Sequence, residues 1–363
     1  MAGHDHGEHP MRSAVAASTV SGVLVVLLTA AAGRVFRSWL SWHALLPLLF
    51  VLGCALAALP VVLRGRCRAR ARRRVFLVVA AFTHKHWVPE LIRDLHENLE
   101  RRGYDMVLKI HDRDYSAASQ IRLLEGILCR RAEYAGGFIM VNEGEVVRAD
   151  LARFCDKARM PIVFVDAEPF ASEDAYPPRT AFAGCDDGMI GAYAARWIAG
   201  RLRSNRIRRA VVLIINGGHY PRRERVFQEQ LKAEVSDVQV IGDCAGFDRS
   251  QAREVVAAHL RRLDKDARKL HAVFCTNDEM ALGASDALLF SGIPWAADAV
   301  VAGVDGTPDA RALIEAGPSP LRATVVQDSY KVAEAAVGLL ERMLRKEPVP
   351  KRTTVPVEIL ARD

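Results

Sequence analysis

The 363-residue chain lacks the motifs and the composition of several large protein classes. It contains no GxSxG, HExxH or GxxxxGK[ST] motif, which argues against a serine hydrolase, a zinc protease and a P-loop enzyme. Its seven cysteines are odd in number and widely spaced, with no CxxC pair, so neither a disulfide framework nor a zinc site is indicated. Half of the residues are hydrophobic and 26% are charged, a balance that excludes a disordered chain.

Most of the chain also lacks an excess of positive or negative charge. The net charge is +7, but seven arginines in residues 64–74 (RGRCRARARRR), a segment without an acidic residue, account for the whole excess. The remainder is close to neutral, so a nucleic-acid-binding body is not predicted. Nothing resembling a helix-turn-helix precedes that remainder, and we expect no nucleic-acid partner.

Long uncharged stretches are confined to the first seventy residues, at 13–33 and 44–63. Each is long enough to cross the roughly 30 Å hydrocarbon core at about 1.5 Å per residue. We therefore expect a polar, histidine-containing tail at 1–12, two transmembrane helices within 13–63, and a polybasic linker at 64–74 that binds anionic lipid.

Two other interpretations of this region remain open. If translation begins at Met11, the first apolar stretch is a signal peptide with Ala30–Ala32 as its cleavage site. The VLGC sequence that ends at Cys54 loosely resembles a lipoprotein box, although the following residues stay apolar. The arginines after the second stretch predict a cytoplasmic location for that end by the positive-inside rule.

From Val75 onward, short β-branched runs alternate with amphipathic helical stretches. VFLVVAA (75–81) is the first run and TVPVEIL, near the C-terminus, is the last. Apolar strands separated by helices are typical of parallel sheets covered on both faces. About eleven such units exceed an ordinary sheet, so the sequence predicts an α/β body of two doubly wound parallel-sheet lobes, preceded by the two hydrophobic helices.

Polar and aromatic side chains occupy the expected carboxyl ends of these strands, where doubly wound sheets bind ligands. Buried polar groups are costly unless they are paired, so a ring of them predicts a polyhydroxylated ligand, and aromatic faces would contact its C–H surface. Polar loops at strand ends are the alternative for any single position. The candidate binding residues are His84, His86, Trp87, Asn142, Asp166, Arg223, Phe247, Asn277, Asp305 and Gln327.

The neighbouring His84 and His86 could instead share a metal, but a ligand hydrogen bond or simple solvent exposure is favoured. No catalytic residue, cofactor or metal is expected. Asp186-Asp187 is interpreted as a helix N-cap rather than as an acid/base pair.

Three segments carry a resemblance to a known family: AVFCTNDEMALGASDAL (272–288), VVAGVDGTPDARALIEAG (300–317) and RATVVQD (322–328). They resemble the sugar-binding proteins of the type I periplasmic binding superfamily, most closely those that bind ribose. The resemblance covers roughly 75–363 and implies a ligand held between two lobes joined by three crossing strands. The implied lobes are 75–185 plus 328–354 and 186–327 plus 355–363.

The resemblance also implies a role for most of the candidate residues. It implies that Asn142 and Asp166 contact the ligand from the first lobe. The implied ligand contacts from the second lobe and hinge are Asn277, Asp305, Gln327, Arg223 and Phe247. Ribose binders have an arginine after the aspartate, where this chain has Ala167 and then Glu168. Their first strand runs into an asparagine and two phenylalanines, where this chain has FTHKHW. A small monosaccharide or polyol is therefore expected, without assurance that it is D-ribose.

The implied activity is non-enzymatic capture of a solute by hinge closure, with delivery to the permease of an ABC-type importer. The alternative is a membrane-tethered sensing module that signals to a kinase or chemoreceptor. Both place the chain at a bacterial cell membrane with its body in the periplasm or cell envelope, against the positive-inside rule.

Overall fold

The computed structural model describes residues 50, 52–54, 74–79, 86–110, 116–142, 144–218 and 221–362. The tail, the linker up to residue 73 and nearly all of the two expected membrane helices lie outside these residues. Within the described ranges, no helix is both long and apolar enough to cross a membrane. Arg70–Asp363 forms a compact unit of its own, and this unit is called the body below.

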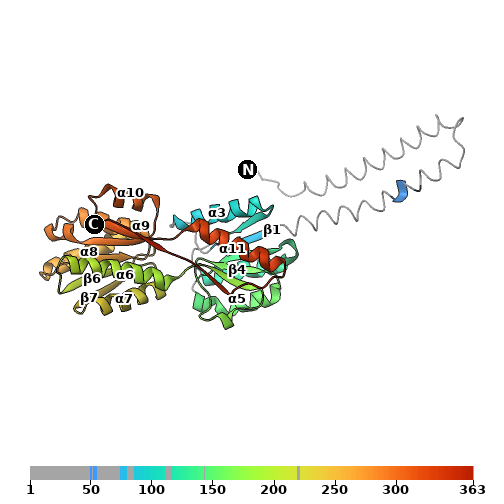
Figure 1. Ribbon diagram of the computed structural model, residues 1–363, viewed down its shortest axis with the longest axis horizontal. Helices are drawn as coiled ribbons and strands as arrows, with labels where there is room; N and C mark the ends of the chain where they lie inside the picture. The colour runs from blue at the N-terminus through green and yellow to red at the C-terminus, as the bar shows by residue number, and fades with distance from the viewer. Residues whose placement is uncertain are drawn as a thin grey trace, which may run out of the picture. The chain divides into compact units, whose positions relative to one another are not determined.

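The first lobe of the body (Figure 1) is built on a six-stranded parallel sheet. Its strand order is β11-β5-β4-β3-β1-β2. Its strands are β1 (Arg74–Val78), β2 (Asp105–Lys109), β3 (Gly136–Met140), β4 (Ile162–Val165), β5 (Thr180–Cys185) and β11 (Arg352–Val355). Its helices are α3 (Trp87–Arg101), α4 (Ala117–Cys129), α5 (Gly144–Ala158) and α11 (Ser329–Leu344), with short 3₁₀ helices η1 (Arg131–Glu133) and η2 (Glu173–Ala175).

The second lobe repeats this plan with the strand order β12-β10-β9-β8-β6-β7, in which only β12 runs antiparallel to its neighbour. Its strands are β6 (Ala210–Asn216), β7 (Val238–Cys244), β8 (Ala272–Cys275), β9 (Val300–Asp305), β10 (Leu321–Val326) and β12 (Glu358–Ala361). Its helices are α6 (Asp187–Ser204), α7 (Pro221–Glu234), α8 (Arg249–Lys265), α9 (Asp278–Leu289) and α10 (Pro308–Ala316), with the 3₁₀ helix η3 (Pro294–Asp298).

Successive residues of a strand enter different cores, because side chains alternate between the two faces of a sheet. In β1, Val75 and Leu77 pack in the cluster that contains residues of α3 and α11, whereas Phe76 packs with residues of α4 and α5. The uninterrupted apolar runs seen in the sequence are therefore strands with helices on both faces. The expected α/β architecture with two parallel-sheet lobes is confirmed.

The chain crosses between the two sheets three times. It leaves the first sheet after β5 to begin α6, returns after β10 to begin α11, and leaves again between β11 and β12. Asp186 caps α6 by accepting hydrogen bonds from the backbone N–H groups of Gly188 (2.7 Å) and Met189 (3.2 Å). The N-cap interpretation therefore holds for Asp186, and these crossings bring the carboxyl edges of the two sheets toward each other.

Candidate functional site

Candidate residues from both sheets lie at the carboxyl ends of their strands. Asn142 and Asp166 follow β3 and β4, while Asn277 follows β8, Asp305 ends β9 and Gln327 follows β10. Electrostatics link the two groups, because carboxylates of both lobes act on the same thiol. Burial, with a smaller contribution from the carboxylates of Asp166 and Asp305, raises the pKa of Cys185 at the end of β5 to about 12.

Four buried side-chain atoms at this edge have no hydrogen-bond partner among the described residues. They are the Trp87 indole Nε1, Asn142 Oδ1, Thr276 Oγ1 and Asn277 Nδ2. Each unsatisfied buried group costs about 1–3 kcal/mol. Two come from each lobe, and together they offer donors and acceptors, which is the pairing that a hydroxyl group provides.

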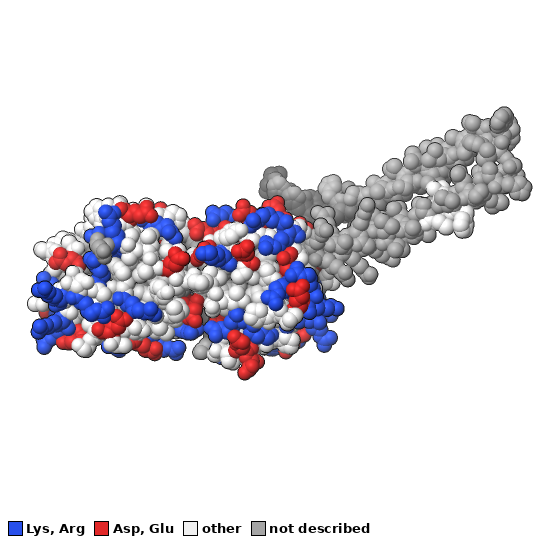
Figure 2. Space-filling view, viewed as in Figure 1, with Lys and Arg blue, Asp and Glu red and all other residues white. Residues whose placement is uncertain are grey.

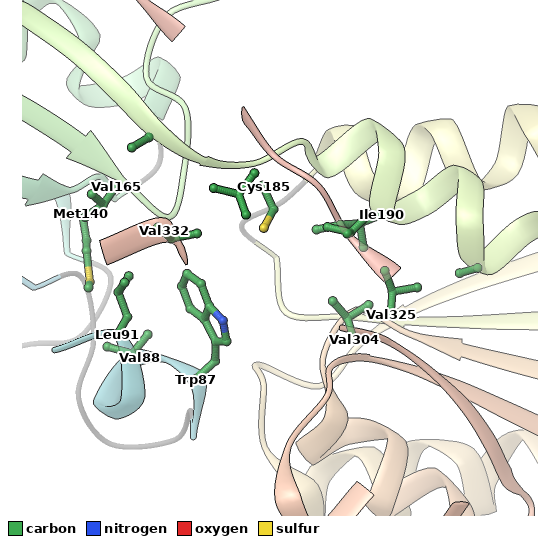
Figure 3. Packing of buried hydrophobic residues seen from close by; sticks show 14 of the residues in the cluster. Trp87, Val88, Leu91, Met140, Val165, Cys185, Ile190, Val304, Val325 and Val332 are labelled. Carbon is green, nitrogen blue, oxygen red and sulfur yellow. The ribbon is translucent and has the colours of Figure 1, made fainter. Parts of the chain in front are cut away.

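Trp87 belongs to a hydrophobic cluster that draws residues from both lobes (Figure 3). Its side chain is buried at the first residue of α3, and Figure 3 shows its indole ring beside Val88 and Leu91, with Val304 and Val325 of the second lobe farther along the same view. The ring is therefore part of the core, while its N–H is the orphaned donor noted above.

Asn142 is fixed by a buried glutamine that sequence reasoning missed. Gln120, on α4, donates from Nε2 to the Met140 carbonyl (2.8 Å) and accepts at Oε1 from the Asn142 backbone N–H (3.1 Å). The Asn142 side chain donates from Nδ2 to the Ser116 carbonyl (3.4 Å), which leaves its Oδ1 for another partner. No local pattern in the sequence marks Gln120, because its partners lie about twenty residues away.

Arg223 is buried, and it is held by Asp187, which was not among the candidate binding residues. Its Nη2 and Nε donate to Asp187 Oδ1 (2.7 and 3.1 Å), and its Nη1 donates to the Thr276 carbonyl (2.6 Å). Gly191 makes this possible, since a Cβ there would lie 2.2 Å from the Arg223 carbonyl oxygen. Burial raises the pKa of Asp187, and the Arg223 guanidinium opposes that shift.

Asp305 and Gln327 form a polar pair at the neighbouring strand ends. Gln327 donates from Nε2 to Asp305 Oδ1 (2.8 Å). Beneath them, the buried Asp278 carboxyl accepts from the Thr307 backbone N–H and from the Thr324 hydroxyl, both at 2.7 Å. Burial and the nearby Asp305 raise the pKa of Asp278 to about 8.

Three of the candidate residues adopt left-handed backbone conformations, with φ of 71° at Asp166, 65° at Phe247 and 114° at Asp305. Such conformations are strained for residues other than glycine and concentrate at functional sites. Phe247 is fully buried, and its ring packs where a Cβ on Gly217 would lie 2.1 Å away. The structure thus places the Phe247 ring in the second-lobe core.

The exposed His86 side chain faces the second lobe, with its Nε2 3.4 Å from Glu279 Oε1 in the first turn of α9. Arg222, at the start of α7, likewise faces the first lobe, with its Nη1 3.9 Å from Glu168 Oε2. Its Nη2 lies 3.4 Å from Asp186 Oδ1. His84 lies outside the described residues. Where the chain is described, no group of three or more His, Cys, Asp or Glu side chains is placed to hold a metal ion.

Glu168, in the loop after β4, takes part in a network at the crossing strands. Arg352 of β11 donates from Nη2 to Glu168 Oε2 (2.9 Å), and the Tyr176 hydroxyl donates to Glu168 Oε1 (3.0 Å). The Glu168 side chain therefore ties β11 to the loop after β4, in addition to facing Arg222.

Comparison with known proteins is consistent with this geometry. Residues 75–348 match the family model described as "Periplasmic binding protein domain". The ribose import binding protein RbsB of Salmonella typhimurium is 24% identical over 80% of this chain and 92% of its own length.

Solved structures at lower identity share the fold. A myo-inositol binding protein of Caulobacter superposes with a TM-score of 0.69 at 19% identity, covering 80% of this chain and 93% of that one. The fructose-binding periplasmic domain of the hybrid two-component system BT1754 gives a TM-score of 0.67 at 19% identity, covering 80% of this chain and 90% of that domain.

Proposed function

Because the chain belongs to the periplasmic binding protein domain family, it is a binding protein rather than an enzyme, and we propose that it captures a small monosaccharide or polyol between its two lobes. The observation that carries the proposal is the set of four orphaned polar atoms on Trp87, Asn142, Thr276 and Asn277. A polyhydroxylated ligand supplies both donors and acceptors to them. The names of the ribose-, inositol- and fructose-binding relatives support this ligand class.

Capture would proceed by hinge closure. A ligand that contacts both lobes favours the closed form by its differential affinity for that form. The lobes that move are proposed to be 75–185 plus 328–354 and 186–327 plus 355–363, with the three chain crossings as the hinge. The contacts of His86 with Glu279 and of Arg222 with Glu168 join the lobes and would add to the closed state.

Within this proposal the ten candidate residues divide into groups with different tasks. Hydrogen bonds to ligand hydroxyls fall to the polar groups, and Trp87 adds an apolar edge as well as a donor. Phe247 shapes the second-lobe wall from within its core. The hydrogen-bonding set comprises His84, His86, Asn142, Asp166, Arg223, Asn277, Asp305 and Gln327.

A thermal-shift screen of residues 70–363 against pentoses, hexoses and polyols tests the function. A ligand at about one hundred times its Kd adds roughly 2.7 kcal/mol to the free energy of unfolding. The rise in Tm should be lost in Asp305→Asn and kept in Asp309→Asn, a matched change on the exposed start of α10. A folded body that shifts with no member of the screen would refute sugar and polyol binding.

For the cellular role, we propose a membrane-anchored receptor that delivers its ligand to an ABC-type importer from the periplasm or cell envelope. The apolar stretches within 13–63 support the anchor, and the import role printed for the RbsB relative supports transport. Resistance of the full chain to alkaline extraction from membranes tests the anchor. Protease digestion of intact spheroplasts tests the side, because only a body outside the cytoplasm would be degraded.

A sensing role is the second candidate, because one solved neighbour is a domain of a two-component system. Deletion of the gene separates the two roles. Loss of labelled-sugar uptake with normal gene induction indicates transport, whereas normal uptake with lost induction indicates signalling.

A further inference from the structure

The loops that precede the strands of the first lobe carry a row of basic side chains. This edge is the amino-terminal end of the parallel strands, opposite the candidate binding site. All of its cations are exposed or half-buried, and Figure 2 shows Lys and Arg side chains gathered at this outer end of the first lobe. The row, called the basic edge below, consists of Arg131, Lys157, Arg159, Arg179, Lys346 and Lys351.

Hydrogen bonds place these side chains next to one another. Arg131 donates from Nη1 to the Lys157 carbonyl (3.0 Å), and Arg179 donates from Nη1 to the Arg159 carbonyl (2.8 Å). Lys351 donates from Nζ to the Pro177 carbonyl (2.9 Å). The partners are backbone carbonyls rather than carboxylates, so these bonds fix the loops without neutralising the positive charge.

Two surface hollows continue the row. One is lined by Arg131, Lys157 and Arg159, and the other by Arg179, Lys346 and Lys351. The acidic residues that line them are Asp156 and Glu347, and Glu347 already pairs with Arg345 (2.6 Å), a bond that lowers the pKa of its carboxyl. The described hollows therefore carry more positive than negative charge.

Three of the basic residues occupy backbone positions that glycine would adopt at lower energy. Arg159, Arg179 and Lys346 have φ of 53°, 60° and 62°. A non-glycine residue is disfavoured in this left-handed region. The basic edge thus has long cationic side chains at turns where glycine would lower the conformational energy of the backbone.

The chain enters the body at the same edge. Arg74 begins β1, and its carbonyl accepts from the Ala135 backbone N–H (2.8 Å) in the loop before β3. The segment before it, 64–73, contains the other six arginines and follows the apolar stretch 44–63. The segment 64–73 that joins this stretch to Arg74 has ten residues, which span at most about 35 Å when fully extended.

We propose that the basic edge binds the headgroups of anionic phospholipids and so holds the first lobe against the membrane surface. This surface belongs to the folded body and is additional to the polybasic linker. Each Lys or Arg near an anionic bilayer contributes by electrostatic attraction that decays within a Debye length. The first lobe is then the stationary one, and the second lobe moves during closure.

The test uses the full chain in lipid nanodiscs, with Cys54→Ser and Cys67→Ser removing thiols outside the body. Cys129, which is exposed at the end of α4 two residues before Arg131, reports on the edge, and the exposed Cys244 at the end of β7 is the internal control. In discs that contain phosphatidylglycerol, maleimide should label Cys129 about tenfold more slowly than in discs of phosphatidylcholine alone. Labelling of Cys244 should be equal in both, and high salt should abolish the difference.

Charge-neutralising variants decide whether the edge is responsible. Lys157→Gln, Arg159→Gln and Lys346→Gln together should restore fast labelling of Cys129. The matched triple change Arg206→Gln, Arg208→Gln and Lys269→Gln, in exposed loops at the corresponding edge of the second lobe, should leave the protection intact. Equal labelling in both discs, protection that survives the first triple change, or a chain that elutes with neither disc would each overturn the proposal.

Discussion

Removal of the buried Arg223 guanidinium should destabilise the body in a manner that depends on pH. The change Arg223→Met keeps most of the side-chain volume but deletes both bonds to Asp187 Oδ1 and the bond to the Thr276 carbonyl. It leaves the Asp187 carboxylate without the cation that opposes the rise of its pKa on burial.

The magnitude follows from what is left behind. Breaking a buried ion pair by removing one partner costs about 3–5 kcal/mol, chiefly because the other charge stays buried. The Asp187 side chain keeps 18% of its exposure, so we expect the lower end, about 3 kcal/mol, near neutral pH. Protonation of Asp187 removes that buried charge, and the destabilisation should therefore shrink as the pH falls.

Urea unfolding of the body at about pH 5 and about pH 8 measures both effects. A carboxyl whose folded pKa is raised loses stability as the pH rises through that pKa, so the difference from the parent protein should be larger at pH 8. The control is Arg225→Met on the same helix, whose exposed pair with Glu229 (3.8 Å) should contribute less than about 1 kcal/mol. A destabilisation by Arg223→Met that is independent of pH would refute the reasoning.

Three further outcomes are expected. Burial and Asp305 raise the pKa of Asp278 to about 8, so the free energy of unfolding should fall as the pH rises from about 4 to about 8. Asp278→Asn should flatten that pH dependence in urea titrations. Gly191→Ala should destabilise the body by about 1–3 kcal/mol in the same assay, since its Cβ meets the neighbouring helix backbone at 2.2 Å, whereas Gly200→Ala in open space on the same helix should stabilise it by about 0.5–1 kcal/mol. Trp87→Phe should weaken ligand binding measured by calorimetry, because it removes an indole N–H that has no described partner, and it should also lower the free energy of unfolding because it empties part of the core; a loss of stability with unchanged affinity would contradict the binding role.

The periodicity of the sequence suffices for the architecture, because each strand and helix leaves a local apolar pattern. The uninterrupted run at 75–79 is a fully sandwiched strand for this reason. The ends of strands are equally readable, because each apolar run gives way to a polar residue there. This local change in polarity is what predicts Asn142, Asp166 and Asp305 as candidates.

Side-chain partners cannot be read in this way. The partner of Arg223 is Asp187, thirty-six positions earlier, and only the close approach of α6 to α7 at Gly191 brings them together. The same holds for Gln120, because its hydrogen-bond partner, the Met140 carbonyl, lies at the end of a neighbouring strand. The packing of the Phe247 ring over Gly217, which accompanies a left-handed backbone at Phe247, is likewise a tertiary contact that the sequence does not predict. Contacts set by tertiary packing leave no mark on spacing in the sequence.

At the last crossing between the lobes, only Pro356 and Val357 separate β11 from β12. The pyrrolidine ring of Pro356 locks its φ near about −65°, and Val357 is buried. Very few torsions are thus free to absorb a change in the angle between the lobes at this strap. If the lobes close as proposed, this connection therefore restricts the range of angles between them more than a longer, glycine-containing connection would.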